Sequence, residues 1–249
     1  MSERAGVNVA VVMPALNAAR TIATLVDEIP RDWVDEVIVV DDASTDETLE
    51  VAKTLNVTVI WHPHNVGYGA NQKTCYLHAL QGGAEVVVML HPDGQYEASL
   101  IPELVRPIVA GEADLVLGSR MRERGAARAG GMPLYKIAAN RTLTTIENRV
   151  MRTQLTDLHT GYRAYSRELL LRVPFLRNSL DFSFDSEMLM QASHYGFRIT
   201  EVPARTRYFQ EASSITLAPA SIYGIKTLWA AARLTLHRRG VVRSRKFAK

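Results

Sequence analysis

Short apolar runs alternate with longer amphipathic stretches along the first half of the chain. The apolar runs over 7–13, 36–40, 57–61, 85–90 and 114–117 predict strands, since turn-forming residues bound them. Between them, 18–29, 44–55, 67–81 and 98–110 have helical spacing or helix-start signals. This β-α order predicts an α/β protein with a mostly parallel sheet, flanking helices and right-handed crossovers.

The second half of the chain is less regular. Residues 122–131 are rich in Arg, Ala and Gly and are expected to form a mobile loop. Pro133 suits the first turn of a helix that ends near residue 151. Residues 153–165 are polar and expected to be irregular, and a helix over 186–195 and a short strand over 198–202 follow.

The C-terminal segment, residues 217–249, has a pattern of its own. Ile222, Ile225, Trp229, Ala232 and Leu236 are spaced three or four residues apart, which predicts one apolar stripe along a helix. Such a stripe suits the interface of a lipid bilayer. Packing on the body of the protein, or on a second subunit, explains it equally well.

The distribution of charge also sets the C-terminal segment apart from the rest of the chain. The net charge of +3 comes from 29 basic and 26 acidic residues, but eight basic residues and no acid follow Glu211. The rest of the chain therefore has 21 basic residues against 26 acids, a net charge of −5. A basic tail favours an anionic partner, either a nucleic acid or an anionic membrane surface.

Composition narrows the class of protein. A chain of 249 residues with 47% hydrophobic and 22% charged residues is typical of one large globular domain, with or without an appendage. Cys75 is the single cysteine, which excludes an internal disulfide and fits a reducing cytoplasm. We expect neither a signal peptide nor a spanning helix, because no run approaches the ~20 apolar residues needed.

Two of the predicted strands run directly into acidic residues. Asp41 and Asp42 end the second strand, while Asp93 and Gln95 follow the fourth. Ligands of open α/β sheets bind outside the carboxyl ends of the strands, and Mg²⁺ or Mn²⁺ prefers oxygen ligands. The pattern predicts a site for a nucleotide and a divalent metal. Acids at a helix N-terminus and a plain Pro-Asp-Gly turn are the structural alternatives.

Six motifs follow one another along the chain: VVMPALN at 11–17, VVDDASTD at 39–46, NVGYG at 65–69, DGQ at 93–95, GSR at 118–120 and TGYRAY at 160–165. In this order, they resemble the motifs of glycosyltransferase family 2, in its branch of polyprenyl-phosphate sugar synthases of the dolichyl-phosphate mannose synthase type. The resemblance covers about residues 7–215.

This resemblance implies a GT-A fold, an inverting mechanism and a nucleotide-sugar donor. It implies that the nucleotide pocket is lined by Pro14, Asn17, Asp41, Asp42 and Asp93. The same analogy implies that Asp93 and Gln95 hold Mg²⁺ or Mn²⁺.

The acceptor site is also implied by the resemblance. Arg120 falls on the arginine that contacts phosphate in the family. Lys136 and Asn140, which share one helix face, fall where the synthases bind the acceptor phosphate, and we assign Arg163 to the same site. The predicted catalytic residues are Asp93, Arg120 and Asp185.

The chain departs from the synthases at two places. They carry another Asp two residues before the metal-binding Asp, where this chain has His91. Either the metal shell is weaker here, or His91 is itself a ligand. They also carry a basic residue in a late loop where this chain has Ser214-Ile215, and Arg205 and Arg207 are the candidates that would supply that charge.

Two further acids have alternative interpretations. Asp157 would orient the acceptor or pair with Arg163. Asp185 falls where many members of the family place a catalytic base, which a hydroxyl acceptor requires, but it is equally suited to cap a helix. A phosphate acceptor is already an anion and needs no strong base.

We therefore expect an inverting, metal-dependent transfer of a hexose from a GDP-mannose or UDP-glucose type of donor to a polyprenyl phosphate, in the cytoplasm or peripherally at the inner face of the cell membrane. The alternative acceptor is a hydroxyl of a soluble, polysaccharide or natural-product molecule. We divide the chain into a GT-A domain over 1–216, with a nucleotide-sugar half over 1–120 and an acceptor half over 121–216, and the segment 217–249.

Two rival classes of protein are disfavoured. A nucleotide-sugar pyrophosphorylase opens with a Gly-rich loop bearing Arg and Lys, which residues 14–17 do not match. Nucleic-acid binding would leave the strand-end acids unexplained. A homodimer stays open.

Overall fold

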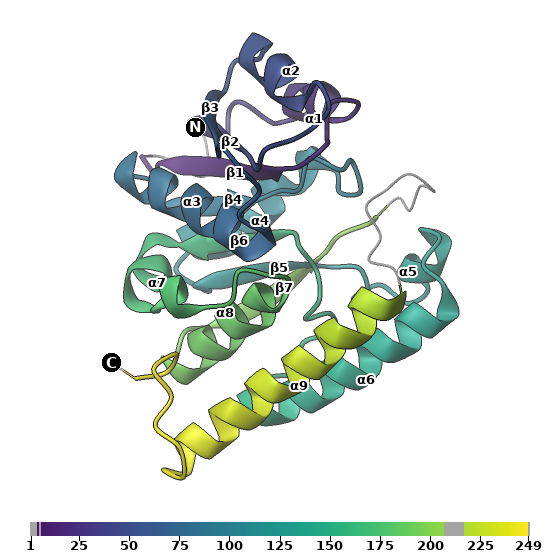
Figure 1. Ribbon diagram of the computed structural model, residues 1–249, viewed down its shortest axis with the longest axis vertical. Helices are drawn as coiled ribbons and strands as arrows, with labels where there is room; N and C mark the ends of the chain where they lie inside the picture. Colours follow the sequence, from purple (N-terminus) through teal and green to yellow (C-terminus); the bar gives the residue numbers. More distant parts are fainter. Residues whose placement is uncertain (1–3, 5, 207–216, 249) are drawn as a thin grey trace.

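The protein is represented by a computed structural model that describes residue 4, residues 6–206 and residues 217–248. Within these residues, the centre is a seven-stranded sheet with the strand order β3-β2-β1-β4-β6-β5-β7 (Figure 1). The strands are β1 (Val9–Ala15), β2 (Glu36–Asp41), β3 (Thr58–Trp61), β4 (Val86–Met89), β5 (Leu115–Ser119), β6 (Arg163–Ser166) and β7 (Ile199–Pro203).

Helices cover both faces of this sheet, which confirms the predicted α/β class with a mostly parallel sheet. They are α1 (Ile22–Asp27), α2 (Thr48–Thr54), α3 (Tyr68–Gln81), α4 (Ile101–Val109), α5 (Ala126–Ala129), α6 (Leu134–Met151), α7 (Arg167–Arg172), α8 (Ser183–His194) and α9 (Leu217–Arg238). Two short 3₁₀ helices span Ala98–Leu100 and Phe175–Arg177.

One strand makes the sheet mostly, rather than entirely, parallel. β6 lies between β4 and β5 and runs antiparallel to both. The expectation of irregular structure over 153–165 is therefore wrong at its end, because β6 begins at Arg163. The strand reads Arg-Ala-Tyr-Ser, and this polar pattern conceals its central, buried position. The predicted loop over 122–131 also contains the short helix α5.

The strands alternate side chains between two apolar layers, as the period of two requires. Val12 and Val40 face the layer formed with α3, α7, α8 and α9. Val11 and Val39 face the opposite layer, which α1, α2 and α4 cover. Burial on both faces explains why β1, β2 and β4 have almost continuous apolar sequences.

The C-terminal helix α9 is part of the main body. It lies beside α6 at the lower edge of the molecule (Figure 1), and its Ala230, Ala231 and Leu234 join the core. The predicted stripe is on the other side of the helix, where Ile225 is 66% and Trp229 58% exposed. Within the described ranges, no helix has the length and hydrophobicity that crossing a membrane requires.

Candidate active site

The candidate site lies at the carboxyl edge of the sheet. β1 pairs with β2 as far as Ala15↔Asp41, but with β4 only as far as Val12↔Met89. Pro14 is buried in β1 and has no N–H to offer to a neighbouring strand. The turns that follow β1, β2 and β4 therefore all start at this edge of the sheet, but they separate from one another there.

Asp41 ends β2 with one carboxylate oxygen unused. Its Oδ2 accepts a hydrogen bond from the Ser44 N–H at 3.1 Å. Its Oδ1 is buried and has no hydrogen-bond partner among the described residues. A buried carboxylate oxygen without a donor is costly in free energy, so it is suited to receive an N–H or O–H group from a ligand.

Asp42 is fully engaged by the protein itself. Oδ1 accepts from the Val66 N–H and faces His62 Nδ1, both at 2.9 Å, and Oδ2 accepts from the Gly67 N–H at 3.1 Å. The side chain thus holds the loop that precedes α3. The structure brings Asp42 to the predicted edge, with its two oxygens directed at the protein.

Asn17 joins the turn after β1 to the turn after β2. It has a φ of 52°, a left-handed conformation that Asn tolerates better than most residues. In this conformation its N–H donates to Ser44 Oγ, and its Oδ1 accepts from the Thr45 N–H, both at 2.9 Å. Asn17 and Asp41 are therefore linked through Ser44.

The turn that contains Asp93 contacts the segment after β1, residues 15–21, at its far end. Asp93 Oδ1 accepts from the Gln95 N–H at 3.0 Å, and Gly94 between them has a φ of 71°. The Thr21 hydroxyl donates to the Pro92 carbonyl of this turn. Segment 15–21 therefore contacts both acidic turns and brings them to one edge of the sheet.

His91, Asp93 and Gln95 are the residues here that could hold a metal. Across the described residues, no three His, Cys, Asp or Glu side chains form a ready-made metal site. Mg²⁺ commonly takes only one or two carboxylates and completes its shell with phosphate oxygens and water. A single half-exposed Asp with a neighbouring amide and imidazole fits a cation that arrives with a diphosphate.

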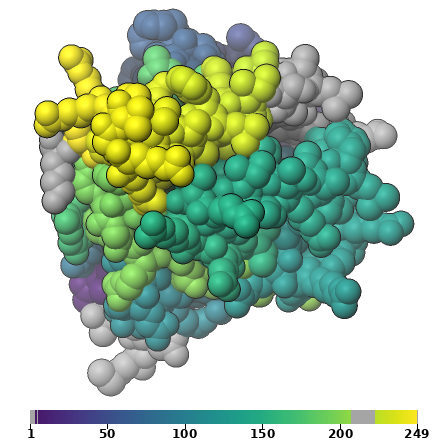
Figure 2. Space-filling view, turned by 90° about the horizontal axis from the view of Figure 1, so that it is seen from below, coloured from purple at the N-terminus to yellow at the C-terminus, as the bar shows by residue number. Residues whose placement is uncertain are grey.

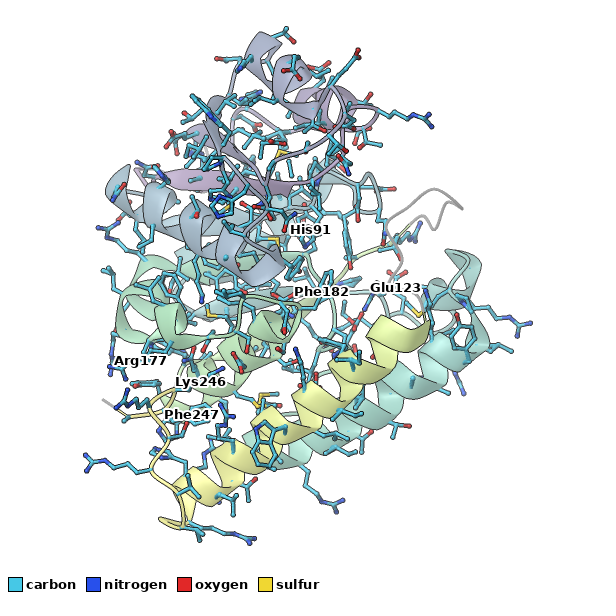
Figure 3. All side chains as sticks on the ribbon, viewed as in Figure 1. His91, Glu123, Arg177, Phe182, Lys246 and Phe247 are labelled. Atoms are coloured by element: carbon cyan, nitrogen blue, oxygen red, sulfur yellow. The ribbon has the colours of Figure 1, made fainter. Side chains whose placement is uncertain are left out.

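Tyr68, at the start of α3, connects His91 with Asp185. Its hydroxyl donates to Asp185 Oδ2 at 2.7 Å and lies 3.0 Å from His91 Nε2. Its ring contacts those of His91 and Phe182, with centroid distances of 5.4 and 4.4 Å; both partners are labelled in Figure 3. Burial lowers the pKa of His91, against the attraction of Asp93 and Asp185. Burial, followed by the charge of Asp185, raises the pKa of Tyr68.

Asp185 lies in the first turn of α8, one of the helices that the sequence predicted, although α8 begins earlier, at Ser183. Besides Tyr68, its carboxylate accepts from Gln72 Nε2 at 3.2 Å. The helix starts without a side-chain cap, so the alternative role as N-cap is wrong.

Arg163 lies fully buried behind Asp185. Its guanidinium donates to the carbonyl oxygens of Leu158, Thr160 and Asp185, and Nη1 is 3.8 Å from Asp185 Oδ1. Arg163 therefore supports the α8 terminus from the middle of the sheet and exposes no surface to an acceptor.

Arg120 forms a bidentate pair with Asp157, at 2.6 and 2.9 Å. The predicted pairing of Asp157 with Arg163 is therefore wrong. Asn140 also donates to Asp157, at 2.9 Å, and Arg120 donates to the His159 carbonyl. Burial disfavours the charge of Asp157, but Arg120 and Asn140 outweigh it and hold the pKa of Asp157 well below its usual range.

The remaining acceptor candidates are more dispersed. Lys136 lies half-exposed one helical turn before Asn140, and Asn140 shares Asp157 as a partner with Arg120. Arg205 is exposed and pairs with Glu123 at 3.6 Å. Arg207 and the Ser214-Ile215 pair lie outside the described residues.

Tyr68 and Gln72 were not predicted from the sequence. Both lie on α3: Tyr68 is within the Gly67-Tyr68-Gly69 motif, which indicated only an unusual helix start, and Gln72 is one turn further on. Gly69 has no room for a side chain, because a Cβ there would lie 2.5 Å from the Ser179 carbonyl. The close approach of α3 to the start of α8 brings Tyr68 to Asp185.

The sequence is similar to those of known proteins. The model of the family described as Glycosyl transferase family 2 matches residues 10–173. The chain is 28% identical over 214 residues, 79% of this chain and 84% of the relative, to UDP-N-acetylglucosamine–dolichyl-phosphate N-acetylglucosaminyltransferase of Methanococcus voltae. It is 27% identical over 201 residues to the polyprenol monophosphomannose synthase of Mycolicibacterium smegmatis, covering 78% and 75%.

Solved structures share the fold. Glucosyl-3-phosphoglycerate synthase from Mycobacterium tuberculosis, in complex with phosphoglyceric acid, matches with a TM-score of 0.73 and 24% identity over 98% of this chain and 84% of that one. The same enzyme in complex with Mn²⁺, uridine diphosphate and phosphoglyceric acid matches with a TM-score of 0.69 and 23% identity over 98% of this chain and 82% of that one. The chain belongs to glycosyl transferase family 2 and is a glycosyltransferase.

Proposed function

We propose that the protein transfers a hexose, with inversion, from a nucleoside-diphosphate sugar to a polyprenyl phosphate, with Mg²⁺ or Mn²⁺ as cofactor. Two relatives are named for transfer to dolichyl phosphate and for synthesis of polyprenol monophosphomannose. Neighbours in fold have been crystallised with Mn²⁺ or Mg²⁺ and uridine diphosphate. These names support the class of donor and acceptor.

The donor nucleotide would bind at the edge formed by Pro14, Asn17, Asp41 and Asp42. The unpaired buried oxygen of Asp41 supports this assignment, because a base N–H or a ribose hydroxyl would satisfy it. Asp42 and Asn17 would act by holding the surrounding turns in place.

Asp93 and Gln95 would hold the cation with the diphosphate, and His91 is the third candidate. When bound, the cation would neutralise charge on the departing diphosphate. Arg120 would add a fixed positive charge, since Asp157 restrains its guanidinium. Lys136 and Asn140 would orient the acceptor phosphate, whose oxygen attacks the anomeric carbon as the nucleoside diphosphate leaves.

One exposed surface favours a lipid acceptor over a soluble one. We call it the α6–α9 face: the exposed large apolar residues of these two helices, which lie side by side as teal and yellow surfaces in Figure 2. They are Leu134, Tyr135, Ile146, Ile222, Ile225, Leu228 and Trp229.

The charge of this face suits anionic lipid. α9 contains no Asp or Glu, and the single acid of α6, Glu147, is fully buried. Exposed cations include Arg141 and Arg149 on α6, and Arg233 lies 5.7 Å over the Trp229 ring on α9. Apolar side chains among these cations, on two helices whose described residues include no exposed acid, favour an anionic bilayer surface over the apolar interface of a homodimer.

A hydroxyl acceptor is the second candidate. Asp185 lies within the Tyr68 network beside His91, where a carboxylate base would be useful. The fold neighbours in complex with phosphoglyceric acid also favour a soluble acceptor. Under this alternative, Asp185→Asn would lower turnover by a factor of about a hundred or more. With a phosphate acceptor, the turnover of the same variant would fall far less.

Transfer is tested with labelled UDP- and GDP-sugars and a polyprenyl phosphate in detergent, with and without EDTA. We expect metal-dependent glycolipid formation, and a fall of about two orders of magnitude or more in Asp93→Ala. Metal-independent turnover, or equal turnover by Asp93→Ala, would contradict the metal assignment. Product formed only on soluble hydroxyl compounds would favour the second candidate.

Membrane contact is tested with vesicles of phosphatidylglycerol and of phosphatidylcholine. We expect the protein to bind the anionic vesicles alone, and salt to weaken this binding. In the double variant Ile225→Asp/Trp229→Asp, the affinity for these vesicles should fall by about tenfold or more. Leu171→Asp, which changes an apolar side chain 61% exposed on α7, is the matched control and should bind as the wild type does. A stable dimer that the double variant dissociates, without vesicle binding, would assign this face to a second subunit.

A further inference from the structure

The Tyr68 hydroxyl determines which nitrogen of His91 carries a proton. An ionised carboxylate can only accept hydrogen bonds, so the hydroxyl proton is used in the 2.7 Å contact with Asp185. The hydroxyl oxygen remains as an acceptor for the 3.0 Å contact with His91 Nε2. This contact is therefore a hydrogen bond that His91 donates.

A neutral imidazole with its proton on Nε2 has a lone pair on Nδ1. Nδ1 of His91 has no hydrogen bond to any described residue, and it is not one of the buried unpaired atoms. It is therefore open to a ligand. Histidines that bind metals almost always donate their other N–H to a carboxylate, a carbonyl or water, which fixes the ring and its tautomer.

The ring of His91 is also held from two sides. A Cβ at Gly161 would lie 2.7 Å from His91 Cδ2 and 2.8 Å from Nε2, so the ring rests directly against the backbone there. Tyr68 stacks on it with an interplanar angle of 24°. Its position follows from packing by α3 and the Gly161 turn, independently of any bound ligand.

We propose that Tyr68 is a positioning residue which links His91 to Asp185, holds the Nε2–H tautomer and thereby makes His91 Nδ1 a ligand of the divalent cation. The inference rests on the proposed metal-dependent transfer and deepens it. The imidazole would take the place of the Asp that the synthases carry two residues before Asp93. The metal-binding turn and the candidate base Asp185 would then form one hydrogen-bonded unit.

The direct test uses Mn²⁺ bound to the full chain with UDP, and in parallel with GDP. Electron spin-echo envelope modulation detects a nitrogen that coordinates Mn²⁺. We expect a ¹⁴N coupling in the wild type and its loss in His91→Ala. If the wild type binds Mn²⁺ and nucleotide without this coupling, the proposal is overturned, whatever the variants do.

The role of Tyr68 is tested by the affinity for Mn²⁺, measured from the free Mn²⁺ resonance. Loss of a group that orients a metal ligand typically weakens metal binding by about 10- to 100-fold, which we expect for Tyr68→Phe. The change should have no further effect in a His91→Ala background, since the two residues act in series. Tyr76→Phe, which removes a buried hydroxyl donating to Gln72 from the same helix, should bind Mn²⁺ as the wild type does.

The outcomes separate this inference from the proposed function. Equal Mn²⁺ affinity of Tyr68→Phe and the wild type, or an equal loss in Tyr76→Phe, would overturn the role of Tyr68 and leave metal-dependent transfer intact. A wild type that binds neither Mn²⁺ nor nucleotide would instead overturn the proposed function itself.

Discussion

Arg120 and Asp157 face each other as a fork and a carboxylate, with Nε 2.6 Å from Oδ2 and Nη2 2.9 Å from Oδ1. Asp157 is fully buried and Arg120 nearly so. The pair joins the end of β5 to the turn before β6, two segments 37 residues apart in the chain. It fixes Arg120, the predicted phosphate-contacting arginine, directly after the end of β5.

Asp157→Asn should destabilise the protein by about 3 kcal/mol, because it leaves the Arg120 charge buried without its partner. Urea unfolding measures the change. Glu103→Gln is the control: it breaks the exposed Glu103–Arg106 pair on α4 and should change stability by less than ~1 kcal/mol. Equal effects of the two variants would contradict a structural role for the buried pair.

The same pair predicts a pH dependence. The pKa of Asp157 is lowered in the folded state, so its contribution to stability is complete above the ordinary Asp pKa of about 4 and is lost as pH falls below it. Unfolding free energies between pH 6 and pH 3 should therefore fall more steeply for the wild type than for Asp157→Asn. Parallel curves would show that Asp157 is not ionised preferentially in the folded state.

Asp41 and Asp42 should respond differently to the same substitution. Asp42→Asn places an amide against the Val66 and Gly67 N–H groups and should cost about 2 kcal/mol of stability. Asp41→Asn removes a charge whose Oδ1 is buried and unpaired, so stability should be equal or higher. We expect Asp41→Asn instead to weaken UDP or GDP binding by about tenfold, measured by calorimetry. Unchanged nucleotide affinity would remove Asp41 from the site.

Gly69→Ala should push α3 away from the start of α8. Its Cβ would lie 2.5 Å from the Ser179 carbonyl and 2.8 Å from Phe184 Cβ, so we expect a loss of about 1–3 kcal/mol. Gly224→Ala on α9 is the control, because a Cβ there would meet only Leu143 Cδ1, at an ordinary contact distance of 3.8 Å. That variant should gain up to about 1 kcal/mol from helix propensity. Thermal and urea unfolding would measure both.

Cys75 should be unreactive in the folded protein. It is fully buried in α3, and burial raises the pKa of its thiol, so little thiolate is available. Labelling by a thiol reagent should be slower than in denaturant by about three orders of magnitude, as a stability above ~5 kcal/mol implies. Rapid labelling in native buffer would indicate local opening of α3.

The sequence contained enough to predict the ends of β2 and β4 and the acids that follow them. Both strands are buried on both faces, so their continuous apolar runs are bounded sharply by Asp41 and by the His91 turn. Local turn chemistry likewise indicated a turn at Pro92-Asp93-Gly94, and in the structure Gly94 has a φ of 71°.

The partners of these residues depended on packing between distant segments. β6 has a polar sequence and is stabilised by its two antiparallel neighbours, so periodicity missed this strand and left Arg163 in a segment expected to be irregular. Tyr68 meets Asp185 across 117 residues, and Arg120 meets Asp157 across 37. The stripe on α9 was visible as a pattern, but only its orientation away from the core makes it an exposed surface. Local patterns specify where a strand or helix ends, whereas contacts between side chains far apart in sequence follow from how those elements pack.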